Sequence, residues 1–206
     1  MKHKFTTMIM ALAAMGALAT QANAVTFDFQ SNGSNVNLGN TSTFTVGGFS
    51  LTASGFLTNG TPTILYAKNL GASETGLGTT ADPSGQNEIF TGDFIQLTLP
   101  TTPPSNFTMV LLASVQVGEQ ALVYFTTTPG TLSGATLIGT ITNADGSVTI
   151  PAGDQTGFID ITAGAVNILL ASATISTPDS GSAVALLGIA LAGIEGVRRA
   201  LRARRA

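Results

Sequence analysis

Cysteine is absent from this chain of 206 residues, and charged residues make up only 9% of it. Without cysteine the chain has no disulfide framework, no zinc–thiolate site and no thiol nucleophile. Tryptophan is absent as well, and the single histidine is His3, close to the N-terminus. Serine–histidine and cysteine–histidine catalytic arrangements are therefore excluded from the rest of the chain.

Basic residues are almost missing from the middle of the chain. Between residues 25 and 176 there are nine acidic residues and a single basic residue, Lys68, so this segment has a net charge of −8. Binding to nucleic acid or to anionic lipid depends on a basic patch. The middle segment has none, so both partner classes are excluded for it.

The N-terminus has the layout of a secretory signal peptide. Charged residues at 2–4 are followed by an apolar run at 8–19 and then by small residues at Ala22 and Ala24. This order predicts cleavage after Ala24, which leaves Val25 as the first residue of the mature chain. The Sec machinery and a signal peptidase are then expected partners.

The middle segment reads as β-structure throughout. Threonine, valine, isoleucine and phenylalanine alternate with polar residues at period two, as in half-buried strands. We expect an all-β fold of the β-sandwich or jelly-roll type, because the runs are short and regularly spaced. The link 118–120 has the length of a hairpin, and Asp145-Gly146 predicts a tight turn between two further strands. The main predicted strands are 25–30, 49–56, 94–100, 107–117, 121–128, 135–141, 147–150, 157–163 and 166–175.

One long segment, residues 69–94, interrupts the strand pattern. It is rich in glycine and holds four of the nine acids, namely Glu74, Asp82, Glu88 and Asp93. We interpret it first as a solvated loop whose acids keep the protein soluble. A calcium site that also uses Asn87 is one alternative, although the segment fails as an EF-hand loop because the turn glycine is misplaced.

Carboxylate chemistry is the other alternative for the 69–94 segment, since paired acids can hydrolyse a glycosidic bond. Such a site also needs a platform for the sugar ring, and the segment between the ends offers only Tyr66 and Tyr124. Both tyrosines fall in strand patterns, where packing in the core or at an edge is expected. Lys68 is interpreted as a solubilising residue on a strand face.

The C-terminus joins a short motif, an apolar stretch and a basic tail in that order. Thr177, Pro178, Asp179, Ser180 and Gly181 form the motif, and residues 182–197 form the apolar stretch. The stretch is short for a full membrane span, which takes about 20 residues. Arginines follow it at Arg198, Arg199 and Arg202, where they are typical of a membrane stop on the cytoplasmic side. The Asp-Ser-Gly tripeptide occurs once, so the two-carboxylate site of an aspartic protease is excluded.

This order of elements resembles the PEP-CTERM group of bacterial sorting signals, and most closely its VPDSG-CTERM variant. The departure is Thr177, where the variant usually has valine. The resemblance implies recognition by an exosortase, a membrane processing enzyme, followed by transfer to the cell surface or to the exopolysaccharide matrix. It also implies an inner-membrane-anchored precursor.

The sequence thus predicts three segments: a signal peptide at 1–24, a β-sandwich domain at 25–176 and a sorting signal at 177–206, whose Arg-rich tail is 198–206. We predict a secreted, non-enzymatic structural protein with a transmembrane sorting helix and without a catalytic, cofactor or metal site. A carbohydrate- or calcium-binding surface module and a carboxylate-dependent glycoside hydrolase remain the alternatives.

Overall fold

In a computed structural model of the chain, the described residues are 23–31, 35–71, 74–100, 105–154 and 156–177, together with 188, 190–195 and 198. Most of the predicted signal peptide, including Ala22, lies outside them. The same holds for Pro178–Gly181, most of the apolar stretch, Arg199 and Arg202.

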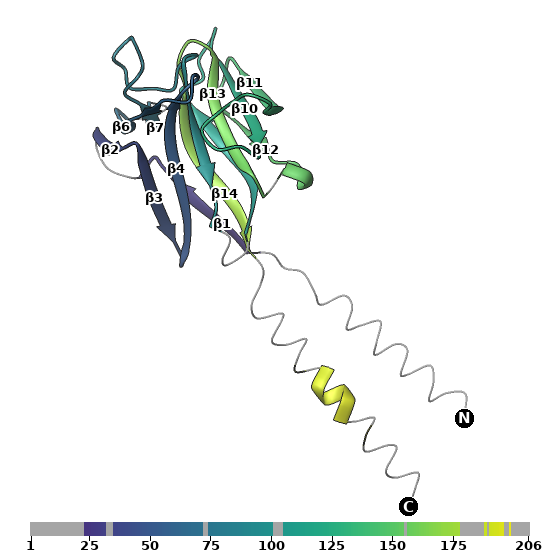
Figure 1. Cartoon of the computed structure of the whole chain (residues 1–206). Coiled ribbons are helices and arrows are strands. Elements are labelled where there is room, and N and C mark those ends of the chain that lie inside the picture. Colours follow the sequence, from purple (N-terminus) through teal and green to yellow (C-terminus); the bar gives the residue numbers. More distant parts are fainter. Residues whose placement is uncertain are drawn as a thin grey trace, which may run out of the picture. The chain divides into compact units, whose positions relative to one another are not determined.

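Two antiparallel sheets make up the domain, which confirms the all-β prediction (Figure 1). Sheet A has the strand order β12-β9-β14-β7-β6-β2, with β1 also paired to β14; sheet B has the order β11-β10-β13-β8-β4-β3, with β5 also paired to β4. The strands of sheet A are β1 (Asn23–Asp28), β2 (Val36–Gly39), β6 (Leu65–Asn69), β7 (Thr75–Thr79), β9 (Asn106–Ala113), β12 (Gly146–Thr149) and β14 (Leu169–Thr177). Those of sheet B are β3 (Thr41–Val46), β4 (Phe49–Leu57), β5 (Pro62–Thr63), β8 (Asp93–Thr98), β10 (Gln120–Thr126), β11 (Thr136–Thr142) and β13 (Phe158–Ala165), and a short 3₁₀ helix η1 (Ala152–Asp154) precedes β13.

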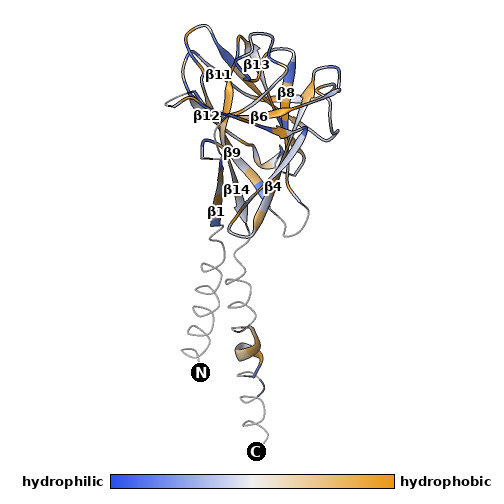
Figure 2. Cartoon of the chain, turned by 90° about the vertical axis from the view of Figure 1, so that its left-hand side faces the viewer, coloured by the Kyte–Doolittle hydropathy of each residue, from blue (hydrophilic) through white to orange (hydrophobic). Residues whose placement is uncertain are grey.

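The hydrophobic core lies between the two sheets, as in a β-sandwich. Phe27, Leu77 and Phe107 come from sheet A, and they form one buried cluster with Leu51 and Ile161 from sheet B. Figure 2 shows hydrophobic residues concentrated in the strands and hydrophilic ones in the connecting loops. Burial of this alternating apolar surface is the main force that holds the sheets together.

The predicted hairpins in the second half of the domain are wrong. β9 pairs with strands of sheet A, whereas β10 pairs with strands of sheet B, so the link between them crosses the sandwich. The chain crosses again between β11 and β12 and between β13 and β14. β9 ends at Ala113 because Ser114, with a φ of 57°, leaves the extended conformation. A short polar link therefore does not distinguish a hairpin from a crossing between two sheets.

Two features of the first half were missed by the sequence pattern. The hairpin β3–β4 pairs Val46 with Phe49 across a two-residue turn at Gly47 and Gly48. Both glycines have positive φ, as a type I′ turn requires. The second feature is β7, which lies inside the segment interpreted as a continuous loop and is buried along its whole length.

The compact unit spans Ala24–Thr177. The residues described beyond it, 188, 190–195 and 198, are helical and exposed. Among all residues that the structure describes, no helix is both long and apolar enough to cross a membrane.

Candidate functional site

An open cleft of about 440 Å³ lies on the outer face of sheet A, away from the core. Tyr66 and Lys68 belong to β6, where they alternate with Leu65 and Ala67, whose side chains are buried. The chain segment 80–92 forms another wall of the cleft. The residues that line the cleft are Asn35, Tyr66, Lys68, Leu70, Glu74, Gly85, Gln86 and Asn87.

Glycine in β7 lets the segment 80–92 lie directly on the sheet. A Cβ atom at Gly78 would stand 2.2 Å from the backbone oxygen of Asn87 and 2.8 Å from Cα of Glu88. No side chain fits in that space, so glycine is required for this close approach. The strand Thr75–Thr79 therefore carries glycine at its second and fourth positions, and glycine is depleted in strands.

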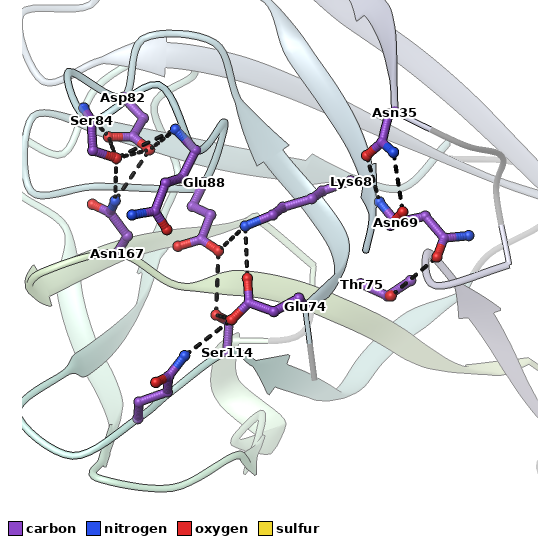
Figure 3. Close-up of polar contacts among 12 residues, drawn as sticks. Asn35, Lys68, Asn69, Glu74, Thr75, Asp82, Ser84, Glu88, Ser114 and Asn167 are labelled. Atoms are coloured by element: carbon purple, nitrogen blue, oxygen red, sulfur yellow. Dashed lines mark hydrogen bonds and ion pairs between the residues drawn. The ribbon is translucent and has the colours of Figure 1, made fainter. Parts of the chain in front are cut away.

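Lys68 is not a solubilising surface residue, as the sequence pattern suggested; only 4% of it is exposed. Its Nζ donates a hydrogen bond to Oε2 of Glu74 at 2.7 Å and another to Oε1 of Glu88 (Figure 3). Glu88 is 2% exposed, whereas the Glu74 side chain is 30% exposed and reaches the cleft. A buried ammonium group is tolerated because two carboxylates compensate its charge.

Buried Ser114 and exposed Gln116 add to this cluster from the crossing after β9. The Ser114 hydroxyl donates to Oε1 of Glu74 at 2.9 Å and lies 3.3 Å from Oε1 of Glu88. The Gln116 amide donates to the same Glu74 oxygen at 3.0 Å. Glu74 thus accepts three hydrogen bonds that favour its charged form.

The two carboxyl groups of the cluster differ in their pKa values. Burial raises the pKa of Glu88, and the adjacent Glu74 carboxylate adds to this effect despite the bond from Lys68. Burial also opposes ionisation of Glu74, but the hydrogen bonds from Lys68 and Ser114 outweigh it and lower its pKa. For Lys68, burial is outweighed by its two carboxylate partners, so its pKa is raised. The protonated form of Lys68 is therefore favoured.

Asp82 does not line the cleft; it stabilises the backbone of the segment that forms one wall of it. Its carboxylate accepts hydrogen bonds from the backbone N–H groups of Ser84 at 2.8 Å and Gln86 at 3.1 Å. The Asn167 amide, which comes from the crossing before β14, donates to Oδ2 of Asp82 at 3.1 Å. Burial of Asp82 is outweighed by the Ser84 and backbone donors, and its pKa is lowered. These bonds fix the segment 82–86 on the domain.

Asp93 is also removed from the cleft. It is fully buried at the start of β8, where its carboxylate accepts bonds from the Thr79 hydroxyl and from the Phe90 N–H group at 2.9 Å. Burial raises its pKa to about 7 although these donors oppose the shift. Of the four acids in the 69–94 segment, Glu74 and Glu88 share hydrogen bonds from Lys68, and Asp82 lies close enough to Asp93 for its charge to add to the raised pKa of Asp93.

The four acids named for the calcium and hydrolase alternatives are held in different hydrogen-bond networks. The Lys68 ammonium lies between Glu74 and Glu88, where a cation would have to bind. Within the described part of the chain, no group of three or more acidic or histidine side chains is arranged to hold a metal ion. Ser114, 1% exposed, is not accessible as a nucleophile. The sequence offered one signal for this cluster, namely a single lysine among nine acids.

Three of the predicted processing residues lie at the ends of the compact unit. Ala24 and Val25 belong to β1, and Thr177 is the last residue of β14, where it is 3% exposed. Arg198 is exposed, and its guanidinium lies 3.7 Å from the Glu195 carboxylate.

Comparison with known families identifies the C-terminal segment. Residues 178–201 carry the VPDSG-CTERM motif. The motif is a variant of the PEP-CTERM-like exosortase sorting signal. It includes Arg198 and Arg199, ends before Arg202, and begins one residue after β14 ends.

No curated protein matches the chain. Among solved structures, a family 29 carbohydrate-binding module from Piromyces equi is 10% identical, with a TM-score of 0.34, over 77% of this chain and 94% of that one. A cleaved adhesin domain of Lys-gingipain from Porphyromonas gingivalis is 12% identical, with a TM-score of 0.31, over 75% of this chain and 95% of that one.

Proposed function

We propose that the chain is an exported protein that an exosortase-type enzyme processes at its C-terminal motif and delivers to the cell surface or to the extracellular, exopolysaccharide-associated matrix. In this proposal the signal peptide directs export, and residues 182–197 hold the precursor transiently in the inner membrane. Arg198, Arg199 and Arg202 stop that segment at the cytoplasmic side. The domain between the two ends acts as a non-enzymatic, structural part of the surface.

The observation that carries this proposal is the VPDSG-CTERM motif at residues 178–201, directly after the last strand. A processing enzyme needs an accessible segment outside the folded domain. Thr177 is buried at the end of β14, so a cut after it would leave both sheets and the core complete. The position of the motif therefore supports removal of the tail from an otherwise unchanged domain.

The side-chain chemistry of the domain supports a non-enzymatic role. Two carboxylates favour the protonated form of Lys68, and the Ser114 hydroxyl donates its hydrogen bond to the same pair of carboxylates. These groups stabilise one another, as in a structural network, and Glu88, whose pKa is raised, is only 2% exposed and is therefore shielded from a substrate.

Intact-mass analysis of the protein recovered from its native cells tests the proposal. We expect an N-terminus at Val25 and a C-terminus near residue 180. The variant Asp179→Ala should keep its tail, whereas Asp154→Ala, a change in the 3₁₀ helix η1, should be processed normally. A native product that retains Arg205 would contradict processing, and recovery of the intact chain from the cytosol would contradict export.

A further inference from the structure

The floor of the cleft combines an aromatic ring with polar groups. The Tyr66 side chain is only partly buried and lines the cleft beside the Lys68–Glu74 pair. A tyrosine ring offers an apolar face and a polar tip. A pyranose ring has the matching character, because its C–H groups form an apolar face and its hydroxyls point outward from the edge.

The rim of the cleft supplies hydrogen-bonding groups of both kinds. Gln86 and Asn87 line it with amides, which donate and accept, and Glu74 lines it with a partly exposed carboxylate, which accepts. Sugar hydroxyls also donate and accept, so this mixture suits them. A volume of about 440 Å³ falls within the range of small-ligand sites, about 300–1,000 Å³.

The cleft is preorganised. The Asp82 carboxylate accepts a hydrogen bond from the backbone N–H group of Gln86. Asn87 and Gly85 adopt the left-handed backbone conformation, with φ values of 60° and 75°, which lets the segment turn tightly. On the opposite wall, the Asn35 side chain bonds to both the N–H group and the carbonyl of Asn69. A ligand that enters a rigid site loses little affinity to the ordering of loops.

Electrostatics select against an anionic ligand. Lys68 is the only basic residue between positions 25 and 176, and two carboxylates already compensate its charge. The net charge of −8 over this segment repels acidic polymers. We propose that the cleft formed by Tyr66, Glu74, Gln86 and Asn87 binds a neutral saccharide, as a segment of a polysaccharide chain. This function goes beyond sorting and does not depend on whether the tail is removed.

Affinity electrophoresis of the full chain tests the proposal, with a detergent that contains no sugar. The gels contain neutral polysaccharides (laminarin, hydroxyethylcellulose, galactomannan or xylan) or acidic ones (alginate or polygalacturonate). Tyr66→Ala should weaken binding about tenfold or more, because it removes the stacking surface. Asn87→Gly removes the amide but keeps the left-handed backbone, and should weaken binding about fivefold.

Asn143→Gly is the matched control, since Asn143 also has a positive φ, of 62°, and does not line the cleft. Its binding should equal that of the unmodified chain. In a Tyr124→Phe background, Tyr66 is the only tyrosine, and its fluorescence should change when the polysaccharide binds. Thermal melting of each variant checks that it is folded.

Retardation by at least one neutral polysaccharide, lost in both cleft variants and kept in the control, supports the proposal. Equal retardation of Tyr66→Ala and the unmodified chain would place the ligand elsewhere and overturn it. Retardation by the acidic polymers alone, or by no polymer, would overturn it as well. These results concern the cleft only, because the intact-mass experiment tests sorting separately.

Discussion

The buried carboxyl group of Asp160 should make the stability of the domain depend on pH. Asp160 is fully buried on β13, on the side opposite to the core residues Ile159 and Ile161. Its Oδ1 accepts a hydrogen bond from the Gln96 amide at 2.7 Å, whereas its Oδ2 has no hydrogen-bond partner among the residues that the structure describes. Gln96 in turn accepts a bond from the Gly130 N–H group at 3.0 Å. The variant Asp160→Asn keeps the shape and the bond from Gln96 but removes the charge.

The expected effect follows from the pKa. Burial raises the pKa of Asp160 to about 7, although the Gln96 bond opposes the shift, whereas an aspartate in the unfolded chain has a pKa of about 4. Between these two values the folded state binds the proton and the unfolded state does not. The stability contributed by this group is therefore fully present below about pH 4 and is lost as the pH rises to about 7. A difference of about 3 pKa units corresponds to about 4 kcal/mol.

Urea unfolding from pH 4.5 to pH 8.5, followed by circular dichroism, measures this effect. Asp160→Asn should lie within about 1 kcal/mol of the unmodified protein at pH 4.5, because an amide resembles a protonated carboxyl group. At pH 8.5 it should be more stable by up to about 4 kcal/mol. Asp154→Asn, on η1 near the surface, serves as the control and should follow the unmodified protein. Parallel stability curves for Asp160→Asn and the unmodified protein would refute the reasoning.

Two further variants test the buried cluster and the glycine contact. Lys68→Met should lower the free energy of unfolding in urea at pH 8 by about 3–5 kcal/mol, because it leaves Glu88 buried without a counterion. The double variant Lys68→Met with Glu88→Gln should recover much of that loss. If the effects of the two changes simply added, the two residues would not be coupled. Gly78→Ala should lower the free energy of unfolding by about 1–3 kcal/mol, because the new Cβ displaces the backbone at Asn87, and an unchanged melting temperature would contradict the close approach.

The strands with alternating apolar residues were predictable from the sequence, because a sandwich imposes a period of two on strands with one buried face. The sequences of β4, β8 and β13 alternate in this way and were placed within a few residues, although β8 and β13 are buried on both faces. β7 was missed because Gly76 and Gly78 stand at its outward positions, and glycine is typical of loops. The requirement for glycine arises from a chain segment that folds onto the strand, which local sequence does not show.

The pairing of strands was less predictable than their positions. A link such as 114–119 permits either a hairpin or a crossing, and the choice depends on which sheet offers a partner. The sequence also did not reveal the burial of Lys68. Glu74 is a neighbour in sequence, but Glu88 and Ser114 are distant and reach the cluster only in the folded domain. The C-terminal motif, in contrast, was predictable from the sequence alone, because the motif is defined by the order of its residues.

Thr177 shows where the domain ends and the sorting signal begins. The residue is 3% exposed in β14, and the match to the VPDSG-CTERM motif begins at the next residue, Pro178. We therefore expect strand β14, which favours a β-branched residue, to determine the residue type at position 177. The processing enzyme should not recognise this position. Thr177→Val should be processed like the unmodified chain, with a change in unfolding free energy of about 1 kcal/mol or less. If Thr177→Val folds normally but its mass shows a retained tail, the hydroxyl group at 177 belongs to the recognised signal, and the boundary between domain and signal lies inside β14.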